Sequence, residues 1–94
     1  MIFFNVPQAK RHLLEEGLVY TLRSKTRATG KTMAVTGSYQ KNLHLCSVYV
    51  ERVLDIRGAF DLIPYVKWSG FRTSEEWIKA ASNYARTLYM VVKI

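Results

Sequence analysis

The sequence predicts an α+β fold, in which a small five-stranded sheet, mixed but mainly antiparallel, closes into a β-barrel with two flanking helices. Five strand-like runs and two helix signals occur within 94 residues. A chain of this length supports a single modest core. Strong curvature or closure of the sheet removes edges that would otherwise be exposed. We therefore expect one domain that spans residues 1–94.

The chain begins with a short apolar run, Met1–Phe4, which we expect to form the first strand. A helix is predicted over residues 7–16, because proline is favoured in a first helical turn, where its missing N–H is not needed. Gly17 follows Glu16 and can adopt the left-handed conformation that ends a helix.

Two further strands are predicted on either side of a polar loop. Leu18–Arg23 is rich in strand-forming residues, and its alternate residues Val19, Thr21 and Arg23 share one face. Residues 24–31 form the loop, and Thr32–Tyr39 is the next predicted strand. A loop of this length between paired strands is typical of a functional segment.

The longest strand signal is His44–Ile56, which follows a turn at Gln40–Asn42. Apolar and polar residues alternate along this run and predict one buried and one exposed face. Ala59–Lys67 contains apolar residues at helical spacing, but Pro64 prevents a regular long helix, so we expect a single turn or a distorted helix.

The C-terminal part begins with a helix signal. Thr73 and Glu76 have the spacing of a capping box, which predicts a helix over residues 74–84. The apolar run Thr87–Ile94 is the expected last strand.

The charge distribution favours a polyanionic partner. The formal net charge is +7, and no acidic residue occurs between Glu16 and Glu51. A positive potential of this kind attracts phosphate backbones and anionic lipid head groups alike. Cys46 is the only cysteine, which excludes an intrachain disulfide and favours a reducing cytoplasmic compartment. No apolar stretch approaches a membrane span, so we expect a soluble protein without a membrane partner.

Cationic, hydroxyl and aromatic side chains together suggest a nucleic-acid-binding surface. Cations contact phosphates, and aromatic rings stack on unpaired bases. The candidate residues are Thr21, Arg23, Lys25, Arg27, Lys31, Tyr39, Trp68, Ser69 and Arg72. The alternative interpretation is a solvated charge cluster that binds no ligand.

Several short motifs resemble the ASCH domains of the PUA-like superfamily. They are Phe3-Phe4, Glu16-Gly17, Thr21-Leu22-Arg23, a basic loop that reaches Gly30, Val48-Tyr-Val50 and Ser69-Gly70-Phe71 before Glu75-Glu76-Trp77. The resemblance spans nearly the whole chain. It implies a small PUA-like β-barrel that binds RNA or a modified nucleoside in a cleft beside the first helix.

Some ASCH domains are amidohydrolases that act on acetylated cytidine, but this sequence departs from their pattern. Leu18 stands where the resemblance implies a catalytic lysine, and Ser69 stands where it implies a glutamate. Neither residue replaces the missing acid–base function. Lys25, Lys31 and Glu75 are weak substitute candidates. Catalysis therefore stays uncertain, with binding favoured and a hydrolase acting on a modified nucleoside or RNA as the alternative.

Other site classes have weaker signals. Gly30-Lys31-Thr32 lacks the earlier glycine of a phosphate-binding P-loop, because Lys25 occupies that position. His12, His44 and Cys46 do not show metal-ligand spacing, so we expect neither a metal nor another cofactor. A protein-interaction module without nucleic-acid binding is a further alternative, and the oligomeric state is left open.

Overall fold

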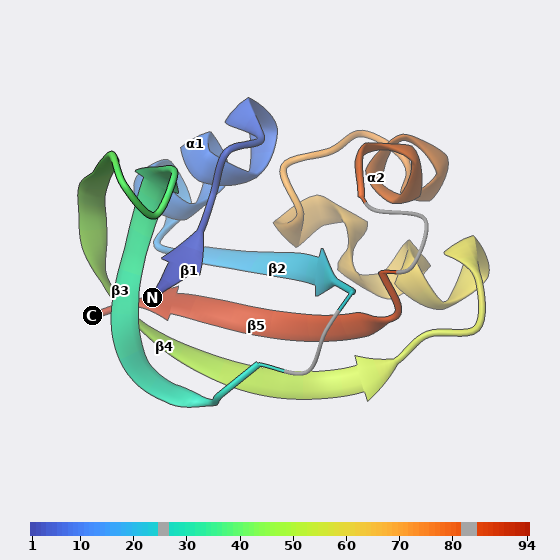
Figure 1. The fold of residues 1–94 in the computed structure, drawn as a ribbon. Coiled ribbons are helices and arrows are strands. Elements are labelled where there is room, and N and C mark those ends of the chain that lie inside the picture. Colours follow the sequence, from blue (N-terminus) through green and yellow to red (C-terminus); the bar gives the residue numbers. More distant parts are fainter. Residues whose placement is uncertain (25–26, 82–84) are drawn as a thin grey trace.

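The computed structural model describes residues 1–24, 27–81 and 85–94. Its elements follow the predicted order of strand, helix, three strands, irregular helix, helix and strand (Figure 1). They are β1 (Ile2–Phe3), α1 (Pro7–Glu16), β2 (Leu18–Arg23), β3 (Gly30–Gly37), β4 (Asn42–Asp55), the 3-10 helix η1 (Ala59–Trp68), α2 (Ser74–Ala80) and β5 (Thr87–Lys93).

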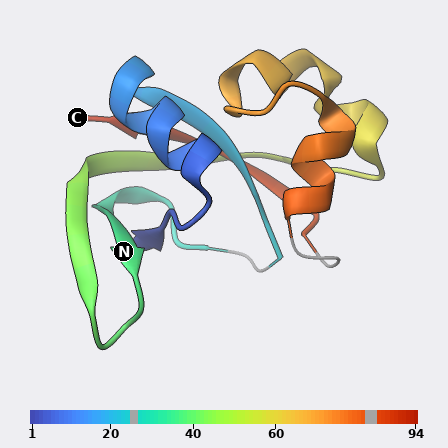
Figure 2. The ribbon, with the colours of Figure 1, turned by 90° about the horizontal axis from the view of Figure 1, so that it is seen from above.

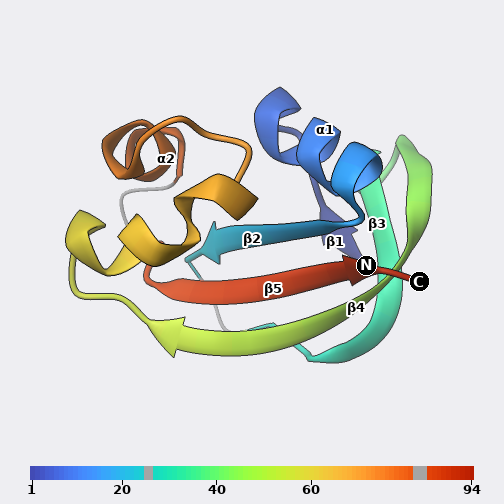
Figure 3. The same ribbon diagram turned by 180° about the vertical axis from the view of Figure 1, so that it is seen from behind.

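The five strands form one mixed sheet in the order β1-β3-β4-β5-β2. β1 pairs with β3 in parallel, and the other three pairings are antiparallel. The sheet curls into a half-barrel, seen from opposite sides in Figures 1 and 3. The predicted α+β class and mainly antiparallel sheet with flanking helices are confirmed, and the arrangement fits a small PUA-like barrel. β1 and β2 are the edge strands.

The curvature of the sheet comes from β4, which spans 14 residues and pairs with both β3 and β5. Its register shifts twice, so that Leu45 is an extra residue opposite β3 and Val53 an extra residue opposite β5. Such bulges bend the strand that contains them and increase its twist. The alternation predicted for His44–Ile56 is therefore interrupted at two points.

Two apolar clusters pack against alternate residues of β2. The first contains Val19 and the α1 residues Ala9 and Leu13, and the second contains Leu22 with residues of η1 and α2. Because successive residues of a strand point to opposite faces, the two clusters lie on opposite faces of β2. Figure 2 shows α1 beside the η1–α2 segment over the sheet. Along β2, α1 lies near the start of the strand and the η1–α2 segment lies near its end (Figure 1).

The first helix agrees with its prediction. Pro7 lies in its first turn, and Gly17 has a φ of 75° after the last helical residue. The N–H of Gly17 donates to the carbonyl of Leu13 at 2.9 Å, which satisfies a helix-terminal acceptor.

The third strand begins and ends two residues earlier than predicted. Gly37 ends β3 with a φ of 109°, and the N–H of Ser38 donates to the carbonyl of Lys41 at 2.8 Å. This turn places Tyr39 outside the strand, with 76% of its surface exposed. The prediction that Tyr39 alternates with Met33 and Val35 in a strand is therefore wrong.

Of the two helical segments near the C-terminus, the first agrees with its prediction and the second is shorter than predicted. Ala59–Trp68 is a 3-10 helix that contains Pro64, in agreement with the predicted distorted helix. Thr73 caps α2, because its Oγ1 accepts from the N–H of Glu76 at 3.1 Å. α2 then ends at Ala80, before the predicted end, and residues 82–84 lie outside the described residues.

Candidate ligand-binding site

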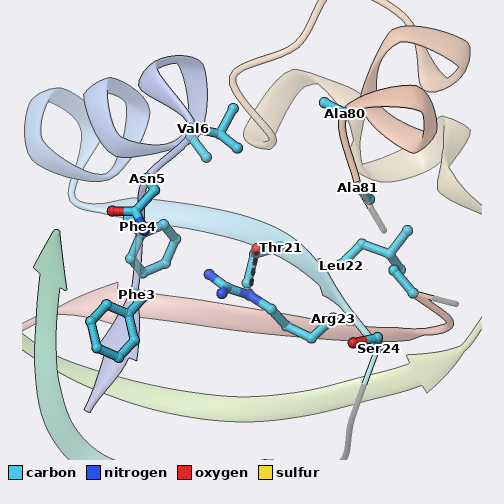
Figure 4. Close-up of a pocket in the computed structure, with 12 residues that line it drawn as sticks. Phe3, Phe4, Asn5, Val6, Thr21, Leu22, Arg23, Ser24, Ala80 and Ala81 are labelled. Atoms are coloured by element: carbon cyan, nitrogen blue, oxygen red, sulfur yellow. Dashed lines mark hydrogen bonds between the residues drawn. The ribbon is translucent and has the colours of Figure 1, made fainter. Parts of the chain in front are cut away.

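A cavity of about 310 Å³ opens between the edge strands β1 and β2 (Figure 4). We call it the barrel-mouth cavity. Its walls come from β1 and the following segment, the start of α1, the end of β2 and the end of α2. The lining residues are Phe3, Phe4, Asn5, Val6, Ala9, Thr21, Leu22, Arg23, Ser24, Ala80, Ala81 and Ala85.

The polar part of the cavity comes from alternate residues of β2. Thr21 and Arg23 share the strand face of Val19, as the alternation predicts. Arg23 Nε donates to Thr21 Oγ1 at 3.1 Å. The guanidinium also lies over the ring of Phe4, with 5.0 Å between Arg23 Cζ and the ring centroid. These contacts fix the arginine in the position that Figure 4 shows.

The guanidinium of Arg23 is electrostatically disfavoured in this position. Burial and, secondarily, the positive charge of Arg27 lower the pKa of Arg23 from its ordinary value to about 10. Among the described residues, the ion pair between Arg52 and Asp55 is the one present, so none involves Arg23. A cation held away from water without a carboxylate partner is a physical basis for binding an anion.

The remainder of the cavity is mostly apolar. Val6, Ala9 and three alanines from the end of α2 and the following segment line it, and Phe3 lies at its β1 side. Phe3 contacts Tyr39 edge to face, with 5.0 Å between ring centroids. Tyr39, a predicted base-stacking residue, therefore reaches this region through Phe3 and does not line the cavity itself.

The backbone of β2 adds polar groups at the same edge. The carbonyls of Gly17 and Arg23 accept hydrogen bonds from Lys93 and Arg86 on the β5 side. In an antiparallel ladder every second residue directs its N–H and C=O groups away from the partner strand, which here applies to Leu18, Tyr20 and Leu22. Leu18 follows this rule, because its carbonyl lies 2.7 Å from His12 Nδ1. By the same alternation, Leu22 directs one donor and one acceptor to the cavity side.

Two further predicted cations, Arg27 and Lys31, line a second cavity of about 350 Å³ near the N-terminus. The N–H of Arg27 donates to Tyr89 Oη at 2.7 Å, and its Nη2 donates to the carbonyl of Met1 at 2.7 Å. Arg27 is thus fixed close enough to Arg23 to lower its pKa. Lys25, another predicted site residue, lies outside the described residues.

The three predicted residues around the Ser69-Gly70 turn do not join Thr21 and Arg23. Ser69 is completely buried, its Oγ donates to the carbonyl of Val66 at 2.6 Å, and it accepts from the N–H of Phe71 at 3.0 Å. Ser69 therefore has no exposed surface to offer a ligand in this structure, and its hydroxyl is hydrogen-bonded within the turn. Trp68 packs against His12 and Lys67, and Arg72 is exposed; neither lines the barrel-mouth cavity.

The weak catalytic candidates are dispersed. Lys31 lines the second cavity, whereas Glu75 lies in the first turn of α2 and lines neither cavity. Burial raises the pKa of the Cys46 thiol, with an opposing contribution from Lys93. A raised pKa makes a cysteine a poorer nucleophile at neutral pH. The described residues therefore do not bring a lysine and a carboxylate together in either cavity.

A groove along α1 differs from these cavities in its charges. It measures about 440 Å³, and its charged lining consists of the cation Arg11 and the carboxylates Glu15 and Glu16. In the part of the chain that the structure describes, no three His, Cys, Asp or Glu side chains are grouped to hold a metal ion. Across residues 1–24, 27–81 and 85–94, no helix is both long and apolar enough to cross a membrane.

Sequence reasoning identified Thr21 and Arg23 but not the aromatic residues that accompany them. Phe4 is 2% exposed, and its contact with Arg23 joins the residue that follows β1 to β2, a strand that is not hydrogen-bonded to β1. The alternation in Met1–Phe4 indicates that Ile2 and Phe4 share a face, but it does not indicate which strand that face meets.

Comparison with known proteins gives no match, whether to a family model, a curated protein or a solved structure.

Proposed function

We propose that this chain is a PUA-like module of the ASCH type that binds RNA or a modified nucleoside in the barrel-mouth cavity. The observation that carries the proposal is the position of Arg23, a largely buried guanidinium that lines the cavity. Its charge is offset by no carboxylate among the described residues. An anionic ligand would supply the missing partner.

The composition of the walls favours a nucleotide-like ligand over a simple anion. Phe3 offers an aromatic surface, and aromatic side chains stack on bases with little dependence on sequence. Leu22 directs a backbone donor and acceptor to the cavity side, and the edge of a base offers the complementary groups. The second cavity, with Arg27 and Lys31, provides cations for neighbouring phosphates of a strand.

The proposal is tested by measuring the affinity of Arg23→Gln for a short unstructured RNA at constant ionic strength. We expect its Kd to rise about tenfold or more, because a charge-assisted hydrogen bond contributes about 1.5 to 3 kcal/mol. Arg57→Gln is the matched control, since Arg57 is exposed and lines neither cavity. This substitution removes the same charge as Arg23→Gln. The control should change Kd by less than about threefold.

Equal losses of affinity in the two variants would mean that diffuse charge attraction explains the binding. Absence of RNA binding by the wild-type protein, together with absence of binding to nucleosides and nucleotides, would overturn the proposed function. Circular dichroism and thermal unfolding of both variants establish that they are folded before affinities are compared.

A further inference from the structure

The hydrogen-bonding groups on the polar side of the barrel-mouth cavity are biased towards donors. Arg23 carries only donors, and its Nε is already engaged by Thr21 Oγ1. The terminal amino groups of the guanidinium are the part directed to the cavity. Thr21 Oγ1 accepts from Arg23, so the hydroxyl can donate its own proton in another direction. Such a set is complementary to a group that has acceptors and no donors.

Asn5, in the segment between β1 and α1, also lines the cavity, but its side chain is engaged elsewhere. Asn5 Oδ1 accepts from Thr36 Oγ1 at 2.9 Å and from the N–H of Gly37 at 2.7 Å, and its Nδ2 donates to the carbonyl of Gly37 at 3.0 Å. These bonds tie Asn5 to the end of β3. No carboxylate lines the cavity among the residues that the structure describes. The side-chain groups available to a ligand are therefore those of Thr21, Arg23 and, at the rim, the exposed Ser24.

From this geometry we infer that the barrel-mouth cavity recognises one nucleotide through its phosphate group, held by the terminal amino groups of Arg23 and the hydroxyl of Thr21. The inference rests on the proposed function and specifies which part of the ligand provides most of the affinity. A phosphate offers acceptor oxygens and negative charge, and an arginine fork binds two of its oxygens at once.

The rigid support of Arg23 strengthens the inference. Phe4 lies under the guanidinium and is 2% exposed, while Thr21 is 7% exposed, so both supporting residues belong to the folded core. An arginine whose position is fixed loses little conformational entropy when it binds a ligand. The apolar wall and Phe3 then contact the base or sugar, which distinguishes a nucleotide from free orthophosphate.

The test compares four probes by isothermal titration calorimetry: a nucleoside, its 5′-monophosphate, ribose 5-phosphate and orthophosphate. The wild-type protein should bind the monophosphate about tenfold or more tightly than both the nucleoside and orthophosphate. Ribose 5-phosphate should fall between orthophosphate and the nucleotide. The comparison is repeated with bases of each type, so that a base preference does not hide the phosphate effect.

Three variants locate the effect. In Arg23→Gln and Arg23→Lys the advantage of the monophosphate over the nucleoside should fall below about threefold, because neither side chain keeps the charged fork. Thr21→Val removes the hydroxyl at nearly constant volume and should reduce the same advantage without abolishing it. Arg57→Gln should keep the full advantage. If one Arg23 variant does not fold, the other and Thr21→Val still provide the result.

A nucleoside that binds wild type as tightly as its monophosphate would overturn this inference, as would orthophosphate that binds as tightly as the nucleotide. These failures are distinguishable from failure of the proposed function. If RNA binding depends on Arg23 but mononucleotides show no phosphate preference, only the inference falls. If neither RNA, nucleoside nor nucleotide binds, both fall.

Discussion

At the level of single residues, Arg23 is a side chain whose charge is disfavoured by its position in the fold. Its pKa is lowered because burial and the charge of Arg27 both disfavour the protonated form. The hydrogen bond to Thr21 and the contact with Phe4 hold the charge in place. Residues that oppose stability in this way are concentrated at functional sites.

Replacement of Arg23 by methionine should therefore stabilise the free protein at pH 7. The lowering of the Arg23 pKa to about 10 corresponds to about 3 kcal/mol of unfavourable free energy. Loss of the hydrogen bond to Thr21 offsets part of this gain. We expect the free energy of unfolding of Arg23→Met, measured with urea, to rise by about 1 to 2 kcal/mol.

The sign of the pH dependence provides the control for this prediction. Between pH 10 and 12.5 the unfolded chain keeps the Arg23 proton that the folded chain has released. The stability of the wild type relative to the variant thus rises with pH in this range. The advantage of Arg23→Met should be complete at neutral pH and about 1 kcal/mol smaller at about pH 11. An advantage that widens above pH 10 would contradict this account.

The residues around Arg23 also show what a sequence reveals about individual side chains. Thr21 and Arg23 were predictable, because alternation along one strand determines which residues share a face. The burial of Ser69 was not predictable. It depends on a turn at the end of η1, in which Ser69 forms hydrogen bonds with Val66 and Phe71. A serine beside a glycine is typical both of a buried turn and of an exposed loop.

At the level of elements, the loop after η1 touches the first turn of α1. Gly70 has a φ of 88°, and a Cβ at this position would collide with the backbone carbonyl of Gln8. The carbonyl carbon of Gln8 would lie 2.7 Å from that Cβ. The absence of a side chain therefore allows α1 and the loop to approach one another.

Gly70→Ala should lower the free energy of unfolding by about 2 to 3 kcal/mol, because it combines left-handed backbone strain with a backbone clash. The expected fall in Tm is about 10 °C for a domain of this size. Gly58→Ala is the matched control, since the backbone there is extended and nothing lies within 4 Å of the added Cβ. The control should change stability by less than about 1 kcal/mol. Similar effects in both variants would show that the contact with Gln8 does not matter.

The elements differ in how far the sequence predicts them. α1 was predicted with its bounds, because Pro7 and Gly17 act locally at its ends. The bulges at Leu45 and Val53 were not predicted from the sequence, because a bulge is defined by the register between two strands. A local pattern records which residues alternate but not where a partner strand skips one.

At the level of the whole molecule, the order of the strands determines where the cavity lies. β1 and β2 are the two edges of the curled sheet, and the barrel-mouth cavity occupies the opening between them (Figure 4). The prediction of a curved sheet followed from element order and length. The location of its opening did not, because it depends on the parallel pairing of β1 with β3 across the sheet.

If the protein binds RNA as proposed, the net charge of +7 and the cavity should make separable contributions to the affinity. Exposed cations such as Lys31 and Arg72 attract phosphates through solvent, where salt screens the interaction. A largely buried guanidinium is screened much less. The dependence of affinity on salt should therefore distinguish the two kinds of interaction.

For a single-stranded RNA, the double variant Lys31→Gln, Arg72→Gln should reduce the slope of log K against log salt by about 0.7 for each phosphate that the protein no longer neutralises. Its affinity should approach that of the wild type at about 0.5 M salt, where surface attraction is largely screened. Arg23→Gln should remain weaker than wild type at the same salt concentration, because the proposed phosphate contact of Arg23 lies inside the cavity. Fluorescence anisotropy over a salt series measures both effects. Convergence of Arg23→Gln with the wild type at high salt would mean that Arg23 acts only as part of the surface charge.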